Sequence, residues 1–330
     1  MHRVQGIAHI PSVVTSHGRN LAARTYSKCP NFRPQLAPTR RYIARTIPTE
    51  TSSSPRLPTL AAPSLSSAQQ PTHVHLVSSF LSSKGILKIS LAFPDPESHY
   101  LEDLLKSLHK HHGHGLPLSH SASRGWFWEI RPSASLFQVK NHQARSETME
   151  VFPWHTDCSY EEAPPRFFAL QMVHADRFGG GTLSVMQVEQ ITRRLSKEST
   201  AALMRAEYRI RVPPEFNKDP GQTSIVGSLL ALDPHDGSTM VRFREEIVTP
   251  LTPSAEAALE ELRGTLRRLE EEEQEPGAIL RLSAQDLPER SILVLDNHRW
   301  LHARSAVKDP QRHLRRVRWN PVPFASRVEV

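Results

Sequence analysis

Three residues of the metal-ligand type stand out in this chain: His155 and Asp157, with one residue between them, and the distant His302. In an extended strand, side chains two positions apart point to the same face, so His155 and Asp157 can reach one ion while Thr156 points away. Two imidazoles and one carboxylate hold Fe(II) by one face and leave the opposite positions open for a bidentate cosubstrate and oxygen. The pattern therefore predicts a mononuclear iron site with oxygenase chemistry.

The His-x-Asp pair is not specific by itself, because the chain contains a second one, His174 and Asp176. This second pair closes an apolar stretch just before three glycines, where polar residues usually end a strand and face solvent, so we predict a structural role for it. The histidine tract within residues 109–114 is interpreted as a loop at a helix end. Cys158 is interpreted as a small buried apolar residue.

The positive charge of the chain is concentrated at its N-terminus. The formal net charge is +7, but residues 1–70 carry nine Lys or Arg and one acid, a net of +8, which leaves 7 − 8 = −1 for the remainder. A nucleic-acid-binding domain carries its basic patch on the folded surface, so this function is disfavoured. Two cysteines give no disulfide framework or thiolate cluster. No apolar stretch reaches the roughly 18 residues that a membrane span needs.

The first fifty residues are rich in Arg and Ser and contain no acid before Glu50, a composition typical of an organellar transit peptide. The run Arg-Thr-Tyr-Ser at 24–27 also resembles a mitochondrial processing site. The alternative is a disordered basic tail on a cytoplasmic protein. Residues 51–73 are dominated by Ser, Pro, Ala, Thr and Gln and are interpreted as a linker. We therefore expect an N-terminal extension over residues 1–73 and a folded domain over residues 74–330.

The folded domain is expected to contain many short strands and a few helices. Apolar runs bounded by turn residues predict strands, and leucines at helical spacing predict helices. Strands are expected at 85–92, 167–173, 182–186, 291–295 and 312–319. Helices are expected after Ser98, which can cap the first of them, and at 187–195, 199–204 and 254–272. This order favours a mainly β fold, a barrel or jelly roll with helical insertions.

Two blocks of sequence carry a family signature. The first begins with Trp154-His155-Thr156-Asp157, continues through Pro164-Pro165-Arg166, and ends in the glycines and Thr182-Leu183. The second contains Asp296-Asn297-His298-Arg299, then His302-Ala303-Arg304, then the arginines of residues 312–316. Together the blocks resemble the taurine dioxygenase and clavaminate synthase family of Fe(II)/2-oxoglutarate-dependent oxygenases. The resemblance covers about residues 80–325 and implies a double-stranded β-helix of the cupin-like type.

The resemblance also implies the metal ligands and the cofactors. His155, Asp157 and His302 would bind Fe(II), with 2-oxoglutarate and O2 as cosubstrates and ascorbate in a supporting role. His298 is a rival for the distal ligand, since it stands where the family usually has Arg. We prefer His302 because Ala303 and Arg304 follow it as the family pattern requires.

Three further residues receive roles by resemblance. Thr182 would contact the far carboxylate of 2-oxoglutarate, and Arg312 would hold that carboxylate by a two-pronged salt bridge, which a planar guanidinium suits. Arg316 would lie near the cosubstrate or an anionic substrate group. Because strand side chains alternate, Arg312, Arg316 and Arg318 share one face and Arg315 lies on the other.

The expected partner is a small anionic or zwitterionic molecule, because Arg316, with Arg242 or Arg244, could pair with a carboxylate or sulfonate. The blocks are most similar to fungal members of the family, some of which oxidise amino acids in secondary metabolism. An amino acid is therefore the expected substrate, and hydroxylation, desaturation or ring closure the expected reaction. The alternatives are a taurine-like sulfonate or a carnitine-pathway amine, a metal enzyme of cupin type without 2-oxoglutarate, and a non-catalytic jelly-roll binding protein. No sequence feature indicates an oligomeric state.

Overall fold

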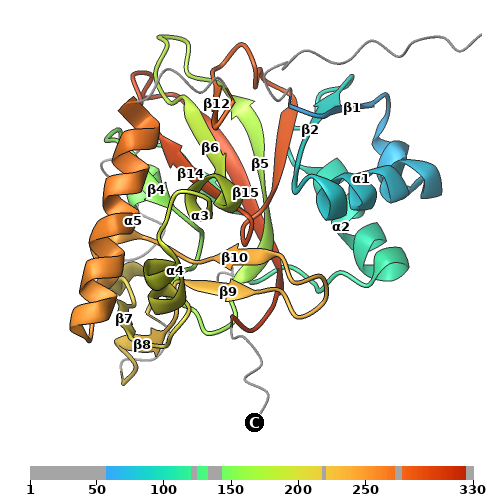
Figure 1. The fold of residues 1–330 in the computed structure, drawn as a ribbon. Coiled ribbons are helices and arrows are strands. Elements are labelled where there is room, and N and C mark those ends of the chain that lie inside the picture. Colours follow the sequence, from blue (N-terminus) through green and yellow to red (C-terminus); the bar gives the residue numbers. More distant parts are fainter. Residues whose placement is uncertain (1–56, 120–124, 133–142, 218–220, 272–276, 325–330) are drawn as a thin grey trace, which may run out of the picture. The chain divides into compact units, whose positions relative to one another are not determined.

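The computed structural model describes residues 57–119, 125–132, 143–217, 221–271 and 277–324 (Figure 1). The first fifty residues, for which we predicted a transit peptide and which include Cys29, lie outside the described ranges. Within them, no helix combines the length and the apolar composition that crossing a membrane requires.

Two sheets form the centre of the domain. In spatial order, the six-stranded sheet contains β1 (Thr59–Ala62), β2 (Ile86–Leu91), β13 (Ser291–Asp296), β5 (Pro165–His174), β15 (His313–Pro321) and β3 (Trp128–Ile130). The four-stranded sheet contains β12 (Ile279–Leu282), β6 (Leu183–Gln187), β14 (Trp300–Arg304) and β4 (Phe152–His155). The strand pairs within both sheets are antiparallel except for β1 with β2.

The remaining elements are short strands and helices. Two small sheets contain β11 (Val248–Pro250), β7 (Tyr208–Arg211) and β8 (Ser224–Gly227), and β10 (Thr239–Val241) and β9 (Leu230–Leu232). The α-helices are α1 (Pro71–Ser83), α2 (His99–His112), α3 (Val188–Thr192), α4 (Lys197–Leu203) and α5 (Pro253–Glu271). Short 3-10 turns are η1 (Leu65–Gln69), η2 (Arg145–Glu147), η3 (Pro214–Phe216) and η4 (Glu245–Ile247).

Strand β5 shows how alternating side chains build the layers. Phe168 and Leu170 belong to a core cluster that also takes residues from the four-stranded sheet, whereas Phe167 and Ala169 pack in a second cluster with residues of α1 and α2. Because both faces are covered, this strand is an almost continuous apolar run rather than an alternating one. The domain is therefore mainly β, a double-stranded β-helix with helices on its outer faces, as the sequence predicted.

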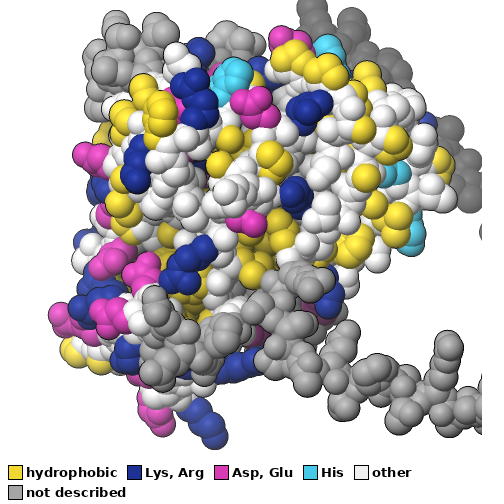
Figure 2. All heavy atoms as spheres, turned by 90° about the horizontal axis from the view of Figure 1, so that it is seen from above, with side chains coloured by type: hydrophobic (Ala, Val, Ile, Leu, Met, Phe, Trp, Pro, Cys, Tyr) yellow, Lys and Arg dark blue, Asp and Glu magenta, His cyan; other side chains and the backbone are white. Residues whose placement is uncertain are grey.

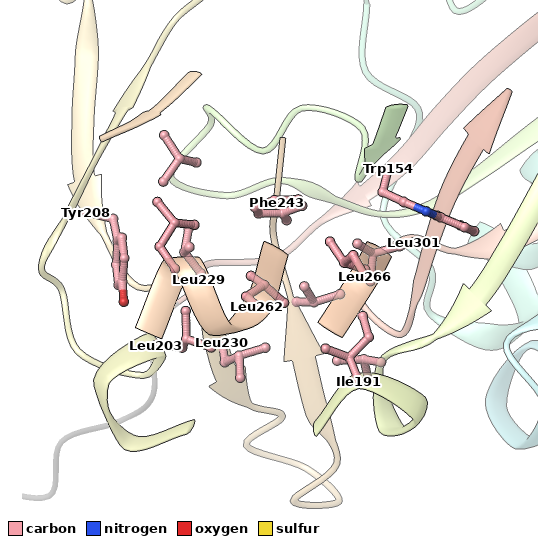
Figure 3. Packing of buried hydrophobic residues seen from close by; sticks show 14 of the residues in the cluster. Trp154, Ile191, Leu203, Tyr208, Leu229, Leu230, Phe243, Leu262, Leu266 and Leu301 are labelled. Carbon is pink, nitrogen blue, oxygen red and sulfur yellow. The ribbon is translucent and has the colours of Figure 1, made fainter. Parts of the chain in front are cut away.

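A third cluster covers the outer face of the four-stranded sheet (Figure 3). Leu262 and Leu266 of α5 pack there with Trp154 of β4 and Leu301 of β14. The leucines of α5 that are spaced at helical intervals in the sequence all lie in this cluster, as predicted. The packing matters for the site, because it fixes which way the neighbours of Trp154 and Leu301 point.

Two sequence-based expectations about the N-terminal half are wrong. Residues 57–73 are not a linker, because β1 pairs in parallel with β2, and Ala62 and Ala68 are fully buried. Few apolar groups suffice there because the sheet edge and the helices α1 and α2 already supply the other side of the contact. The Ser98 side chain does not cap α2; the Asp95 carboxylate accepts the His99 and Tyr100 N–H groups instead, at 2.9 and 3.0 Å.

The other predicted elements are confirmed to within a few residues, including β2, β5, β6, β13, β15 and the helices α3 to α5. On the face shown in Figure 2, basic and acidic side chains are interspersed and neither charge forms a continuous area.

Candidate metal centre

The two predicted histidine ligands lie opposite each other on neighbouring strands. His155 ends β4 and His302 lies in β14, and the antiparallel register pairs them directly. Trp154 and Leu301 pack under α5, so alternation turns the next side chain of each strand toward the interior between the sheets. Phe152 stacks on the His155 ring at 3.6 Å, and Phe168 lies against the His302 ring.

His155, Asp157 and His302 together form a cluster of buried ligand atoms, all within 4.8 Å of one another. Among the described residues it is the one such group of three that could share an ion. His155 Nδ1 lies 2.7 Å from the Pro153 carbonyl oxygen. A carbonyl only accepts, so Nδ1 carries the proton and Nε2 keeps its lone pair for a metal.

The sequence predicts Asp157 in an extended strand with His155. In the structure, Asp157 lies in the turn after β4. Asn297 fixes this turn: its side-chain oxygen accepts the Asp157 N–H at 2.7 Å, and its amide donates to the Asp157 and Pro165 carbonyls. Thr156 does point away, since its hydroxyl oxygen accepts the Phe243 N–H at 3.1 Å. Asn297 is a positioning residue that we did not single out from the sequence, although it stands inside the second signature block.

The electrostatics of the three side chains suit a divalent cation. Burial lowers the pKa of His155 well below its usual value and that of His302 to about 4, so both rings are neutral ligands at neutral pH. Burial acts to raise the pKa of Asp157, but Arg316 and then Arg318 outweigh it and hold that pKa well below its usual range. Asp157 Oδ2 is buried and has no hydrogen-bond partner among the described residues. A buried anionic oxygen of this kind is costly without a partner, and a bound cation would supply one.

One cavity beside the cluster, here called the Arg312 cavity, is lined by basic and apolar side chains. It is lined by Ile130, Ser146, Phe152, His155, Phe168, Leu170, Leu183, His302, Arg304, Arg312, Leu314 and Arg316. Its open space amounts to about 390 Å³, part of it continuous with solvent. Arg304 donates to the carbonyls of Ser146 and Thr148, which holds this part of the wall in place.

Arg312 is the buried basic group of this cavity that fits the predicted anchor for a carboxylate. It is 5 % exposed, and burial followed by the charge of Arg304 lowers its pKa to about 10. Two buried guanidiniums that repel each other are stabilised by an anion between or beside them. Gly181 permits this placement: it has a φ of +62°, and a Cβ there would lie 2.7 Å from Arg312 Nε.

Thr182 lies between Gly181 and the first residue of β6, but it is not among the residues that line the Arg312 cavity. Its N–H donates to Ser305 Oγ at 3.0 Å, and its carbonyl accepts the Ser305 N–H. Leu183, the next residue, faces the cavity instead. Contact between Thr182 and a cosubstrate stays a prediction from resemblance.

A second cavity, here called the Arg318 cavity, also adjoins the cluster. It is lined by Ala144, Arg145, Ser146, Phe152, His155, Thr156, Asp157, Cys158, Ser159, Tyr160, Phe216, Arg244, Arg316 and Arg318. Arg316 lines both cavities, and its Nη1 donates to Asp157 Oδ1 at 3.1 Å. Arg318 is 4 % exposed and lies with Nη1 2.6 Å from Cys158 Sγ. The predicted common face of Arg312, Arg316 and Arg318 is confirmed, as is the burial of Cys158.

The other candidate residues are distributed away from the cluster. His298 is buried edge-on against Phe324 and does not belong to the group of three ligands. His174 is exposed beside Glu289, as predicted for a structural residue, but its neighbour Asp176 is buried rather than facing solvent, because four backbone N–H groups surround it. The tract at residues 109–112 forms the last turn of α2.

The two additional arginines proposed for an anionic substrate differ in position. Arg242 donates to the carbonyls of Ser228 and Glu161 and does not line the Arg318 cavity. Arg244 does line it, but pairs with Glu246 at 3.1 Å. The structure thus favours Arg244 over Arg242 as a group near the cluster, and Arg318 lines the same cavity.

Comparison with known proteins places these features in a family. The family described as taurine catabolism dioxygenase TauD, TfdA matches residues 119–318. A curated relative from Fischerella ambigua (strain UTEX 1903), 3-((Z)-2-isocyanoethenyl)-1H-indole synthase, is 29 % identical over 203 residues, which are 58 % of this chain and 71 % of the relative.

Two solved structures share the fold at low sequence identity. Asparagine oxygenase with Fe(II), 2S,3S-3-hydroxyasparagine and succinate aligns with a TM-score of 0.59 and 16 % identity, over 77 % of this chain and 82 % of that one. The non-heme iron oxygenase OrfP with Fe and alpha-ketoglutaric acid aligns with a TM-score of 0.55 and 17 % identity, over 77 % and 83 % of the chains.

The matched family, together with the triad and the fold, defines the class of this protein. The chain belongs to the TauD/TfdA family. It is a 2-oxoglutarate-dependent non-haem iron dioxygenase.

Proposed function

We propose that the protein oxidises a C–H bond of a small amino-acid-like substrate, with Fe(II) held by His155, Asp157 and His302 and with 2-oxoglutarate anchored by Arg312. The observation that carries the choice of substrate is the Arg318 cavity. Two fully enclosed guanidiniums, those of Arg316 and Arg318, line it beside the cluster, and they favour an anionic group close to the reacting position.

The charges around this cavity support a carboxylate-bearing occupant. Arg145 and Arg244 at its rim both contact Glu246, at 3.4 and 3.1 Å, so part of their charge is already compensated. Asp157 pairs with Arg316, but a bound divalent ion would draw on the same carboxylate. The inner wall would then hold an excess of positive charge, which a substrate carboxylate would balance.

The iron and 2-oxoglutarate supply the oxidising power, with O2 consumed and succinate and carbon dioxide released as the substrate loses hydrogen or gains oxygen. The protein's part is to bind, orient and exclude water. Arg312 would bind the far carboxylate of 2-oxoglutarate in the Arg312 cavity. Phe152 and Phe168 pack against the rings of His155 and His302 and would exclude water from them. Arg316 and Arg318 would orient the substrate from the Arg318 cavity.

The relatives support this class of substrate without identifying the molecule. Solved structures of the neighbours contain 2S,3S-3-hydroxyasparagine and (3S)-hydroxy-L-Arg, which are both hydroxylated amino acids. The name of the curated relative denotes a product with an ethenyl group, which keeps desaturation beside hydroxylation as the outcome.

The test is succinate release from 2-oxoglutarate with Fe(II) and ascorbate, measured against a panel of amino acids and N-modified amino acids, taurine and a trimethylammonium amine. We expect release to depend on the carboxylate, so that the amide of any active acid is turned over far more slowly. The Arg318→Met variant should raise the KM of that acid by about tenfold, which corresponds to one lost charge-assisted hydrogen bond. Preference for the quaternary amine or for taurine would contradict the substrate class. Turnover without 2-oxoglutarate would favour the cupin-type enzyme, and metal binding without any turnover would favour the binding protein.

A further inference from the structure

The second His-x-Asp pair contains a buried carboxylate that joins two distant loops. Asp176 Oδ1 accepts the N–H groups of Phe178 and Gly180, at 2.9 and 3.1 Å, in the turn between β5 and β6. Its Oδ2 accepts the N–H groups of Lys308 and Asp309, at 2.8 and 3.2 Å, in the loop between β14 and β15. Asp176 is only 4 % exposed. One oxygen thus binds each loop, and the two loops lie 132 residues apart in sequence.

Both loops reach Arg312, which lines the Arg312 cavity. The first loop ends in Gly181, which lies so close to the Arg312 side chain that a Cβ there would be 2.7 Å from Arg312 Nε. The Gly181 N–H donates to the Ala306 carbonyl at 2.8 Å. The second loop carries Arg312 itself, whose N–H donates to the Asp309 carbonyl at 3.0 Å. The fit is close, since a Cβ on Gly180 would lie 2.6 Å from Asp176 Oδ2 and 2.7 Å from the Ala306 carbonyl oxygen.

We infer that Asp176 is a positioning residue for the cosubstrate: it locks the two loops so that the Arg312 guanidinium stays in the cavity. The inference rests on the proposed role of Arg312. Lost hydration and then the charge of Arg304 disfavour the buried, charged Arg312 guanidinium and act to push it outward, whereas the charge of Asp176 acts to keep it in place. The lock opposes this movement through four hydrogen bonds to a charged acceptor, which are stronger than bonds to a neutral one.

The Asp176→Asn variant tests the lock, because it keeps the shape of the side chain but replaces one acceptor oxygen with a donor that faces N–H groups. Binding is measured by calorimetry on the full chain loaded with Zn(II), which avoids turnover. Two ligands are compared: 2-oxoglutarate, and 2-oxopentanoate, which has the same chelating end but no far carboxylate. We expect the Kd of 2-oxoglutarate to rise by about tenfold or more and that of 2-oxopentanoate to change by less than twofold.

A second variant and a control complete the experiment. Gly180→Ala should separate the same loops and selectively weaken binding of 2-oxoglutarate. It therefore tests the inference even if Asp176→Asn does not fold. His174→Ala, which changes the exposed partner of the motif, should leave both Kd values unchanged. Equal weakening of both ligands would mean general loosening and overturn the inference, as would an unchanged Kd for 2-oxoglutarate. If the wild-type protein binds the two ligands equally, the proposed role of Arg312 fails first, and the inference fails with it.

Discussion

The ion pair between Arg316 and Asp157 gives a prediction that links stability to metal binding. Arg316 Nη1 lies 3.1 Å from Asp157 Oδ1, and the two side chains are 6 % and 5 % exposed. Replacing Arg316 with Met leaves the buried Asp157 carboxylate without its hydrogen-bonded cation, and only the more weakly acting Arg318 remains. Removal of one partner from a buried pair typically costs about 3–5 kcal/mol. For a domain of this size that is a decrease in Tm of roughly 10 °C in metal-free protein.

A bound divalent ion should restore much of that loss, because it becomes the new partner of Asp157. Mn(II) or Zn(II) should therefore raise the Tm of Arg316→Met by more than it raises the Tm of the wild-type protein. The assay is thermal unfolding of both proteins with chelator and with increasing metal. In the wild-type protein the ion must compete with Arg316 for the same carboxylate, so its added stabilisation is smaller.

The neighbouring residue on β15 provides the matched control. Arg315 points to the opposite face, where it pairs with Glu129 at 2.8 Å and is 13 % exposed. Arg315→Met removes a similar charge and a similar pair, yet its loss of stability should not depend on metal. Equal metal responses in wild type and Arg316→Met would refute the reasoning, as would a metal-free Arg316→Met protein as stable as wild type.

Three further predictions follow from the same geometry. His302→Ala should abolish both metal binding and succinate release, whereas His174→Ala should mainly alter stability; the reverse result would show that the wrong His-x-Asp pair was chosen. Burial lowers the pKa of His114 to about 4, and its Nδ1 accepts the Trp319 Nε1–H at 3.1 Å. Because the folded pKa lies below the unfolded value of 6.5, this group's stabilisation is complete above pH 6.5 and is lost as the pH falls toward 4, by on the order of 3 kcal/mol. The free energy of unfolding in urea should therefore fall less steeply between pH 6.5 and 4 in His114→Phe than in the wild-type protein, in which His155 and His302 contribute to the same decrease. Asp95→Ala removes the acceptor for two N–H groups of α2 and should lower the free energy of unfolding by about 1–2 kcal/mol, while an unchanged urea midpoint would argue against the cap.

The histidine ligands could be predicted from the sequence because their placement depends on local alternation. Trp154 and Leu301 are apolar residues that pack under α5, and the histidine after each of them must face the other way. The same rule predicted the common face of Arg312, Arg316 and Arg318. What alternation could not give is the turn at Asp157, which depends on hydrogen bonds from Asn297, 140 residues further along the chain.

Contacts of this long-range kind explain the other differences. Residues 57–73 have the composition of a linker, and their order comes from pairing with β2 and packing against α1 and α2, which no local pattern reports. In the same way, the sequence marks Asp176 only as the end of an apolar strand. Its four N–H partners become visible only when the loops after β5 and after β14 are brought together.

Three buried arginines, Arg312 just before β15 and Arg316 and Arg318 within it, show where prediction from periodicity ends. Their even-numbered spacing puts Arg312, Arg316 and Arg318 on one face, yet each has a different neighbour: Gly181, the Asp157 carboxylate and Cys158. The neighbour determines what each guanidinium has left to bind. Arg312 packs on a glycine and keeps its charge for the Arg312 cavity, whereas Arg316 must divide its charge between Asp157 and any ligand. A substitution series along this strand should therefore separate cosubstrate affinity from metal-dependent stability, because position 312 controls the first and position 316 the second.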